Sequence, residues 1–293
     1  MNRIERCFDR LRAQASRKDS WTDERTDSRT DERKDSRTDE VSSLQVSYLG
    51  QKALVCFLTC GDPDMPTTVD LVKTIVEAGA DIVELGVPFS DPLADGPSIQ
   101  ASSFRALQAG ATVPKVLDCV REIRRECDAP LVLMTYYNPI QKYGLARFAT
   151  DAARAGADGV ITTDLPPEES GEWKPAADAA GLATIQLVAP TSTKERIKQA
   201  ANMASGFIYC VSRTGVTGAR DDIPTELREL VSTIKSISDL PVVVGFGISR
   251  AEHVRKVNEF ADGAVVGSAL VNVVAARGDL LKRAGEFVES LKR

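Results

Sequence analysis

Residues 81–97 read Asp-Ile-Val-Glu-Leu-Gly-Val-Pro-Phe-Ser-Asp-Pro-Leu-Ala-Asp-Gly-Pro, an apolar run followed by a polar loop rich in proline. The run from Asp81 to Gly86 predicts a buried strand in which Glu84 is embedded among apolar residues. A carboxylate in such a strand is costly unless it is paired or used in chemistry. Asp95, at the far end of the loop, can face the same cavity, and two carboxylates in different environments often divide acid and base roles.

Working outward from this stretch, short apolar runs alternate with amphipathic helical segments from Lys52 to the end of the chain. Such runs are typical of strands covered on both faces. Eight of them predict a closed α/β fold, a (β/α)8 TIM barrel over 51–293. An open doubly wound sheet is the alternative, but it normally shows Gly-x-Gly-x-x-Gly after the first strand, where this chain has Thr59-Cys-Gly-Asp-Pro63. The expected strands are Ala53–Leu58, Ile82–Gly86, Leu131–Thr135, Gly159–Thr162, Ala183–Val188, Gly206–Val211, Val242–Gly245 and Gly263–Val266.

Length and charge narrow the class of protein. The 293 residues suit one α/β barrel with additional segments, and the net charge of −5 argues against nucleic acid or an anionic membrane as the main partner. No apolar run reaches the ~18 residues of a membrane span. The start, Met-Asn-Arg-Ile-Glu-Arg, has no apolar core of a secretory signal, so we expect a cytoplasmic protein.

The cysteines and the single histidine exclude several kinds of site. The six cysteines form no Cys-x-x-Cys or Cys/His cluster, so we expect reduced thiols and no metal. His253 is the only histidine, and its place at the start of a helical pattern predicts a solvated side chain. One histidine argues strongly against Ser-His-Asp catalysis and against multi-histidine metal sites.

The amino-terminal part has a different character. Residues 1–14 predict an extra helix of the barrel domain, because Asn2 and Glu5 have the spacing of a capping box and apolar residues follow at helical intervals. Residues 15–50 form a low-complexity charged insertion. Within it, 17–40 is an eight-residue unit repeated three times, which places like charges at i,i+4 and offers no apolar face. We therefore expect disorder there, with a docking tail as the alternative.

Polar and small residues follow the carboxyl ends of the predicted strands, where barrels of this kind carry their chemistry. Glu84 could instead be a structural carboxylate that accepts hydrogen bonds from loop N–H groups. Asp95 could be only a turn former. The small residues after the last three strands could be plain turn residues when taken singly, but together they predict a phosphate site built from backbone N–H groups and a helix amino terminus. Ser268 is placed to cap the helix that follows. The segment from Arg213 to Arg220 reads as a mobile lid or as an ordinary surface loop. The small residues meant are Gly218, Gly247, Gly267 and Ser268.

Several of these motifs together resemble the tryptophan synthase α subunit family. The resemblance covers 1–14 and about 51–293. It rests above all on the long motif of 83–97, supported by Phe57-Leu-Thr-Cys-Gly-Asp-Pro-Asp, Thr135-Tyr-Tyr-Asn-Pro-Ile, Asp164-Leu-Pro-Pro-Glu-Glu, Ser212-Arg-Thr-Gly-Val-Thr-Gly and Gly245-Phe-Gly-Ile-Ser.

The resemblance implies a lyase that cleaves indole-3-glycerol phosphate to indole and glyceraldehyde 3-phosphate in tryptophan biosynthesis. It implies that Glu84 transfers protons and that Asp95 accepts the indole N–H and stays ionised, with burial raising the pKa of Glu84. It further implies no cofactor in this chain, and a β-subunit partner that holds pyridoxal phosphate in an α2β2 heterotetramer. The remaining implied roles are Phe57 and Tyr209 at the indole pocket, Thr217 and Arg213 in the lid, and Gly218, Gly247, Gly267 and Ser268 at the phosphate.

The sequence departs from the family pattern at Cys56, Cys60 and Gln186, and most of all in the charged insertion. Gln186 lies in an expected strand where an apolar residue is usual, so we expect it to reshape the pocket slightly. Two alternatives to a lyase within an α–β complex stay open. One is a lyase that works alone and releases free indole, and the other is a non-catalytic barrel that only activates a β partner.

Overall fold

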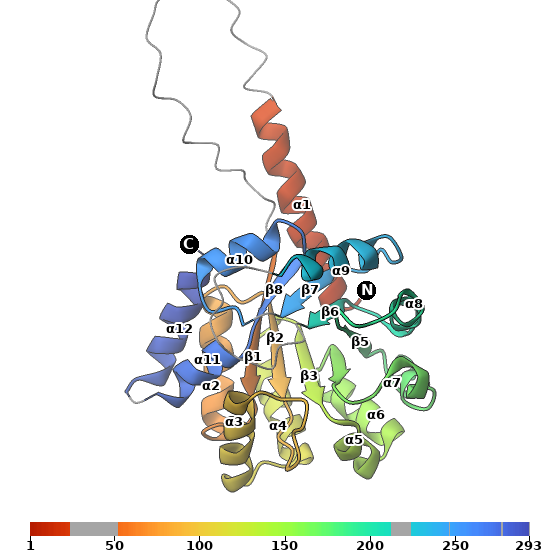
Figure 1. Ribbon diagram of the computed structural model, residues 1–293. Helices are drawn as coiled ribbons and strands as arrows, with labels where there is room; N and C mark the ends of the chain where they lie inside the picture. Colours follow the sequence, from red (N-terminus) through yellow and green to blue (C-terminus); the bar gives the residue numbers. More distant parts are fainter. Residues whose placement is uncertain (24–51, 212–223, 246, 277, 293) are drawn as a thin grey trace, which may run out of the picture.

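The computed structural model describes residues 1–23, 52–211, 224–245, 247–276 and 278–292, with side chains from 1–14 in the first segment. Its strands form a closed, parallel barrel in sequence order, β1 to β8, and β1 pairs with β8 to close it. Helices surround this barrel on the outside (Figure 1). The predicted TIM-barrel architecture is confirmed. The strands are β1 Ala53–Thr59, β2 Ile82–Gly86, β3 Leu131–Thr135, β4 Gly159–Thr162, β5 Ala183–Val188, β6 Ile208–Val211, β7 Val242–Gly245 and β8 Gly263–Val266.

Some helices of the described residues begin at signals that the sequence carries. Four of them start after a residue whose side chain accepts a hydrogen bond from a backbone N–H of the first turn, namely Asp64, Thr112, Thr193 and Asp279. The helices are α1 Arg3–Asp23, α2 Met65–Glu77, α3 Pro97–Gln108, α4 Val113–Arg124, α5 Tyr137–Tyr143, α6 Leu145–Ala155, α7 Trp173–Ala179, α8 Lys194–Met203, α9 Thr225–Lys235, α10 Ala251–Asn258, α11 Ser268–Ala275 and α12 Leu280–Leu291, with a short 3-10 turn at Pro167–Glu169. None of the helices in the described ranges is long and apolar enough to cross a membrane.

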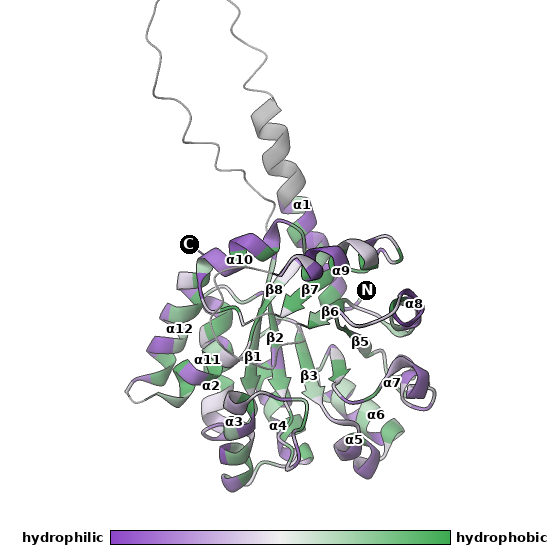
Figure 2. Cartoon of the chain, in the orientation of Figure 1, coloured by the Kyte–Doolittle hydropathy of each residue, from purple (hydrophilic) through white to green (hydrophobic). Residues whose placement is uncertain are grey.

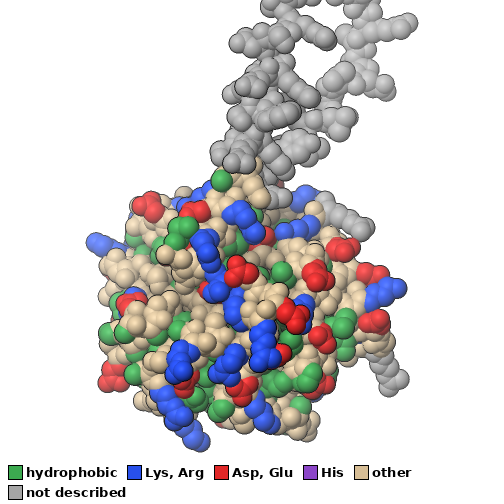
Figure 3. All heavy atoms as spheres, turned by 180° about the vertical axis from the view of Figure 1, so that it is seen from behind, with side chains coloured by type: hydrophobic (Ala, Val, Ile, Leu, Met, Phe, Trp, Pro, Cys, Tyr) green, Lys and Arg blue, Asp and Glu red, His purple; other side chains and the backbone are tan. Residues whose placement is uncertain are grey.

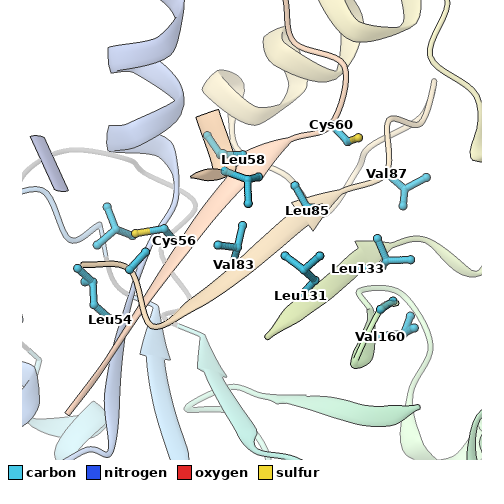
Figure 4. Close-up of a cluster of buried hydrophobic side chains, with 14 of the residues drawn as sticks. Leu54, Cys56, Leu58, Cys60, Val83, Leu85, Val87, Leu131, Leu133 and Val160 are labelled. Atoms are coloured by element: carbon cyan, nitrogen blue, oxygen red, sulfur yellow. The ribbon is translucent and has the colours of Figure 1, made fainter. Parts of the chain in front are cut away.

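Each strand contributes to two separate apolar layers, because successive side chains point to opposite faces. Leu54, Cys56 and Leu58 of β1 belong to the layer between the strands and the surrounding helices, and Figure 4 shows them with their neighbours from β2 to β4. Val55 belongs to the layer inside the barrel, with the alternate residues of the other strands. The strands are accordingly apolar along almost their whole length, and polar colour gathers on the outer faces of the helices (Figure 2).

Helix α1 closes the amino-terminal end of the barrel. Ile4, Phe8 and Leu11 are buried in the inner layer, and the ring of Phe8 lies 6.1 Å from that of Phe207. Arg3 anchors the helix through ion pairs with Asp128 and Asp158. In Figure 1, α1 projects from the end of the barrel opposite to α3 and α5, so it lies away from the carboxyl ends of the strands.

Three expectations about local structure were wrong. Helix α1 runs to Asp23 and so takes in 17–23, for which we expected disorder; a helix already nucleated on the barrel extends at little further cost. Residues 24–51, with the rest of the repeat, lie outside the described residues. Strand β6 begins at Ile208, because Gly206 has a φ of +82° that a strand does not allow. His253 is not solvated but 2% exposed, beside the Ser249 N–H and the Arg250 guanidinium.

Candidate active site

Glu84 lies near the middle of β2 with its side chain directed into the barrel. Its neighbours in the sheet are Phe57 of β1 and Val132 of β3. The side chain is fully buried, and neither carboxylate oxygen has a hydrogen-bond partner among the described residues. Burial without a compensating partner raises the pKa of Glu84 from 4.5 to about 8. Glu84 therefore holds its proton at neutral pH, which suits a general acid.

Asp95 ends the loop between β2 and α3 and is half-buried. Its N–H donates to the carbonyl of Pro92 at 3.1 Å, and the Gln100 amide donates to the carbonyl of Asp95 at 2.8 Å, so the turn is closed locally. Burial raises the pKa of Asp95 to about 6, while a hydrogen bond from Tyr136 opposes that rise. At pH 7 Asp95 is therefore mostly ionised, which matches the role expected for it, although its pKa is higher than that of an ordinary aspartate.

Tyr209 connects the two carboxylates in space. It lies on β6 in the inner layer, and its pKa is raised well above 10 by burial and by the negative charges of Glu84 and Asp95. A charge acts appreciably only on nearby groups, so Tyr209 lies close to both carboxylates. The structure thus brings together residues that lie more than a hundred positions apart in the sequence.

Two glycines make room for the aromatic walls of this space. A Cβ added to Gly86 would lie 2.6 Å from the Phe57 ring, and one added to Gly245 would lie 2.5 Å from the Tyr209 hydroxyl. Real Cβ atoms do not approach other atoms so closely, so each ring needs glycine on the neighbouring strand. Sequence reasoning did not identify these two positions as part of the site. A glycine at the end of a strand that pairs with an aromatic-bearing strand is the signal that could have found them.

The residues predicted to bind phosphate lie at the ends of β7 and β8. Gly247 has a φ of +43° and open space where a Cβ would be. Gly267 lies close to Phe57, because a Cβ added to Gly267 would be 3.7 Å from the Phe57 Cβ. Gly267 occupies the N-cap position of α11, and Ser268 is the first residue inside the helix, which corrects the expectation that Ser268 caps it. Gly218, Thr217 and Arg213 lie outside the described residues, so their roles stay predictions.

Gln186 faces away from the predicted substrate space, contrary to our expectation that it reshapes the pocket. Its neighbours Ile185 and Leu187 face the inner layer, so Gln186 points outward, where it is 7% exposed. There it lines a cavity of about 450 Å³ together with Thr162 and Arg196. Asp164, which follows β4, accepts the Tyr137 N–H at 2.7 Å at the start of α5.

A buried carboxylic acid near an ionised carboxylate, enclosed by aromatic rings at the carboxyl end of a parallel barrel, defines a (β/α)8 enzyme of the acid–base class. The family is evident from sequence comparison. Residues 45–292 match the family model described as tryptophan synthase alpha chain, and the chain belongs to this family.

Individual relatives agree with this assignment. The chain is 51% identical over 250 residues to a tryptophan synthase alpha chain of Geobacter sulfurreducens, an alignment that covers 85% of this chain and 95% of that protein. Among solved structures, the α subunit of tryptophan synthase from Legionella pneumophila superposes with a TM-score of 0.81 at 36% identity, covering 99% and 97% of the two chains. A chain from the tryptophan synthase α2β2 complex of Pyrococcus furiosus superposes with a TM-score of 0.78 at 41% identity, covering 82% of this chain and 97% of that one.

Proposed function

We propose that this chain is a carbon–carbon lyase that cleaves indole-3-glycerol phosphate to indole and glyceraldehyde 3-phosphate. Membership in the tryptophan synthase alpha chain family supports the substrate and the reaction. The observation that carries the mechanism is Glu84, a fully buried carboxyl group without a partner in the described residues and with a pKa of about 8. A group of this kind can give a proton and take one back near neutral pH.

In the proposed reaction, protonated Glu84 delivers its proton to C3 of the indole ring. The ring then becomes an electron-deficient iminium. The bond between C3 and the glycerol carbon breaks, and its electron pair returns to the ring. The hydroxyl on that glycerol carbon loses its proton, which the Glu84 carboxylate can accept, and becomes the aldehyde. Protons and electrons therefore balance without any further reactant.

Asp95 acts on the other side of the indole ring in this proposal. The ring nitrogen gains positive character when C3 is protonated, so an ionised carboxylate that accepts the N–H stabilises the intermediate more than the substrate. A pKa of about 6 supports this role, because Asp95 is mostly ionised at the pH where Glu84 still holds its proton. The different environments of the two carboxylates thus favour opposite protonation states.

Phe57 and Tyr209 would pack against the indole, and the far end of the substrate would lie at the strands that follow. We assign the phosphate to backbone N–H groups at Gly247, Gly267 and Ser268, where the amino terminus of α11 favours an anion. We also assign Gly218 to the phosphate, and Thr217 and Arg213 to a lid over the substrate, from the resemblance alone.

We further propose a β-subunit partner that docks at the carboxyl end of the barrel and receives the indole. The Pyrococcus relative is part of an α2β2 complex. In this chain, Leu93 is 91% exposed and Phe104 is 61% exposed, on the loop that ends in Asp95 and on α3. A partner docked on this face would remove both apolar side chains from water. The face shown in Figure 3, by contrast, carries mixed Lys, Arg, Asp and Glu side chains with only scattered apolar ones.

We propose that pyridoxal phosphate belongs to that partner and that the chemistry of this chain uses no cofactor, since proton transfer by Glu84 and charge stabilisation by Asp95 suffice for the bond cleavage. We also propose a cytoplasmic location, which agrees with six cysteines that are all buried and free.

The test is an indole-release assay on the purified chain with indole-3-glycerol phosphate, alone and with a β subunit. We expect slow release by the chain alone and a faster rate with the β subunit. Equal rates in both arms would favour a lyase that works alone. No indole in either arm, from a folded chain, would contradict the proposed activity and favour a non-catalytic barrel.

A further inference from the structure

Tyr136 connects the loop of Asp95 to the barrel. It follows β3 directly, is buried, and directs its hydroxyl toward 94–95. The Ala94 N–H donates to this hydroxyl at 3.0 Å, and the hydroxyl in turn donates to the Asp95 carboxylate. The ring of Phe89, from the start of the same loop, lies 5.2 Å from the Tyr136 ring.

Within the described part of the chain, the other hydrogen bonds of residues 90–95 have both partners inside 90–100. They are Ser90 to Asp91, the Leu93 and Asp95 N–H groups to carbonyls of the same turn, and Gln100 to the carbonyls of Pro92 and Asp95. These bonds fix the shape of the loop but not its position relative to Glu84. The Tyr136 hydroxyl is the contact that fixes its position, because β3 carries Tyr136 and pairs with β2, the strand of Glu84.

We propose that Tyr136 is a positioning residue, whose hydroxyl holds the Asp95 carboxylate at a fixed place opposite Glu84 and keeps it in its charged form. This inference rests on the proposed function, since it concerns Asp95 as the acceptor of the indole N–H. The phenol oxygen accepts the Ala94 N–H and is also hydrogen-bonded to the Thr163 side chain. Because an ionised carboxylate can only accept, the phenol is the donor in its hydrogen bond with Asp95. The Ala94 N–H also polarises the phenol and makes it a stronger donor.

The electrostatics of the pair agree with this direction. The pKa of Tyr136 is raised by burial and by the Asp95 charge, so the phenol stays protonated and can donate. A hydrogen bond to the charged form of a carboxyl group lowers its pKa. Loss of the hydroxyl therefore leaves Asp95 with the effect of burial alone, and a larger fraction of the carboxyl becomes protonated at pH 6–7.

The test compares Tyr136→Phe with Tyr137→Phe in the indole-release assay across pH 5.5–9. The phenol of Tyr137, the next residue, makes no hydrogen bond in the described part of the chain, so Tyr137→Phe is the matched control. For Tyr136→Phe we expect kcat/KM to fall about 10–100-fold at pH 7, the range for a hydrogen bond to a charged group. We also expect the acid limb of the pH profile to move to higher pH, so that the loss becomes smaller at pH 8. Tyr137→Phe should change neither.

Asp95→Asn in the same assay separates this inference from the proposed function. If Asp95→Asn leaves kcat/KM unchanged, the role of Asp95 is wrong and the inference about Tyr136 is wrong with it. If Asp95→Asn lowers kcat/KM but Tyr136→Phe does not move the acid limb, only the positioning role is overturned. Replacement of Tyr136 by 3-fluorotyrosine, which keeps the ring and strengthens the donor, should move the limb to lower pH. This replacement preserves the size of the side chain, so loss of folding is not a concern. If the acid limb of the pH profile stays in place, the inference is overturned.

Discussion

Replacement of Glu84 by Gln should make the protein more stable and nearly inactive at once. The carboxyl group is buried without a partner, and its pKa rises from 4.5 to about 8 on folding. Gln has almost the same shape but cannot ionise. The variant therefore removes the proton transfer. It also removes a free-energy cost of folding, because Glu84 must take up a proton on folding at a pH where the unfolded chain has released it.

The sign and size of the stability change follow from the pKa of Glu84. The pKa of Glu84 is higher in the folded state than in the unfolded state. The contribution of Glu84 to the free energy of unfolding is therefore fully present below pH 4.5 and is lost as the pH rises toward 8. In that interval the loss is about 1.4 kcal/mol for each pH unit, which gives roughly 5 kcal/mol by pH 8 and roughly 3 kcal/mol by pH 7. Glu84→Gln should thus exceed the parent in stability by roughly 3 kcal/mol at pH 7 and by little near pH 4.5.

Thermal or urea unfolding at pH 5.0 and pH 7.5 measures this difference, with Glu77→Gln on the exposed side of α2 as the matched control. We expect Tm to rise by roughly 5 °C or more at pH 7.5 for Glu84→Gln, a smaller rise at pH 5.0, and no rise for the control. Indole release should fall by about 10²–10⁴-fold, the usual contribution of a general acid–base residue. A Tm difference that is the same at both pH values, or unchanged indole release, would refute the reasoning.

Further outcomes can be checked in the same assays. The kcat/KM of the parent should be bell-shaped in pH, falling below about 6 as Asp95 gains a proton and above about 8 as Glu84 loses one; a flat profile over pH 5–9 would contradict these roles. Gly245→Ala would place a Cβ 2.5 Å from the Tyr209 hydroxyl, so the ring must move, and we expect a higher KM in steady-state kinetics and a stability loss of about 1–3 kcal/mol. Phe8→Ala should cost about 3–5 kcal/mol in urea unfolding, because Phe8 packs inside the amino-terminal end of the barrel, but should leave KM unchanged. Deletion of 24–40 should leave indole release unchanged, and a clear loss would point to a role for the repeat.

The sequence predicted much of the fold and part of the candidate site. Eight apolar runs and the helices between them were enough for the barrel, because strands buried on both faces need apolar side chains along their whole length. Glu84 stood out as a candidate because it interrupts such a run, and Asp95 because it ends the loop that follows; their roles stay predictions. The sequence could not assign a role to Tyr136, since an aromatic residue after a strand is equally suited to a pocket wall or a loop anchor. His253 was misjudged because helical periodicity does not show which neighbouring side chains cover a residue.

By itself, the sequence determined the barrel class and the family and singled out Glu84 and Asp95 as candidates, because these depend on residue types and on spacing along the chain. Only the tertiary structure decided what surrounds each group. It left Glu84 without a partner among the described residues, gave Asp95 the Tyr136 hydroxyl, and set Gly86 and Gly245 beside the rings that need their space. It also turned Gln186 away from the barrel interior. The physical reason is that a pKa, a hydrogen bond or a close approach depends on distances of a few ångströms between strands, which closure of the barrel sets.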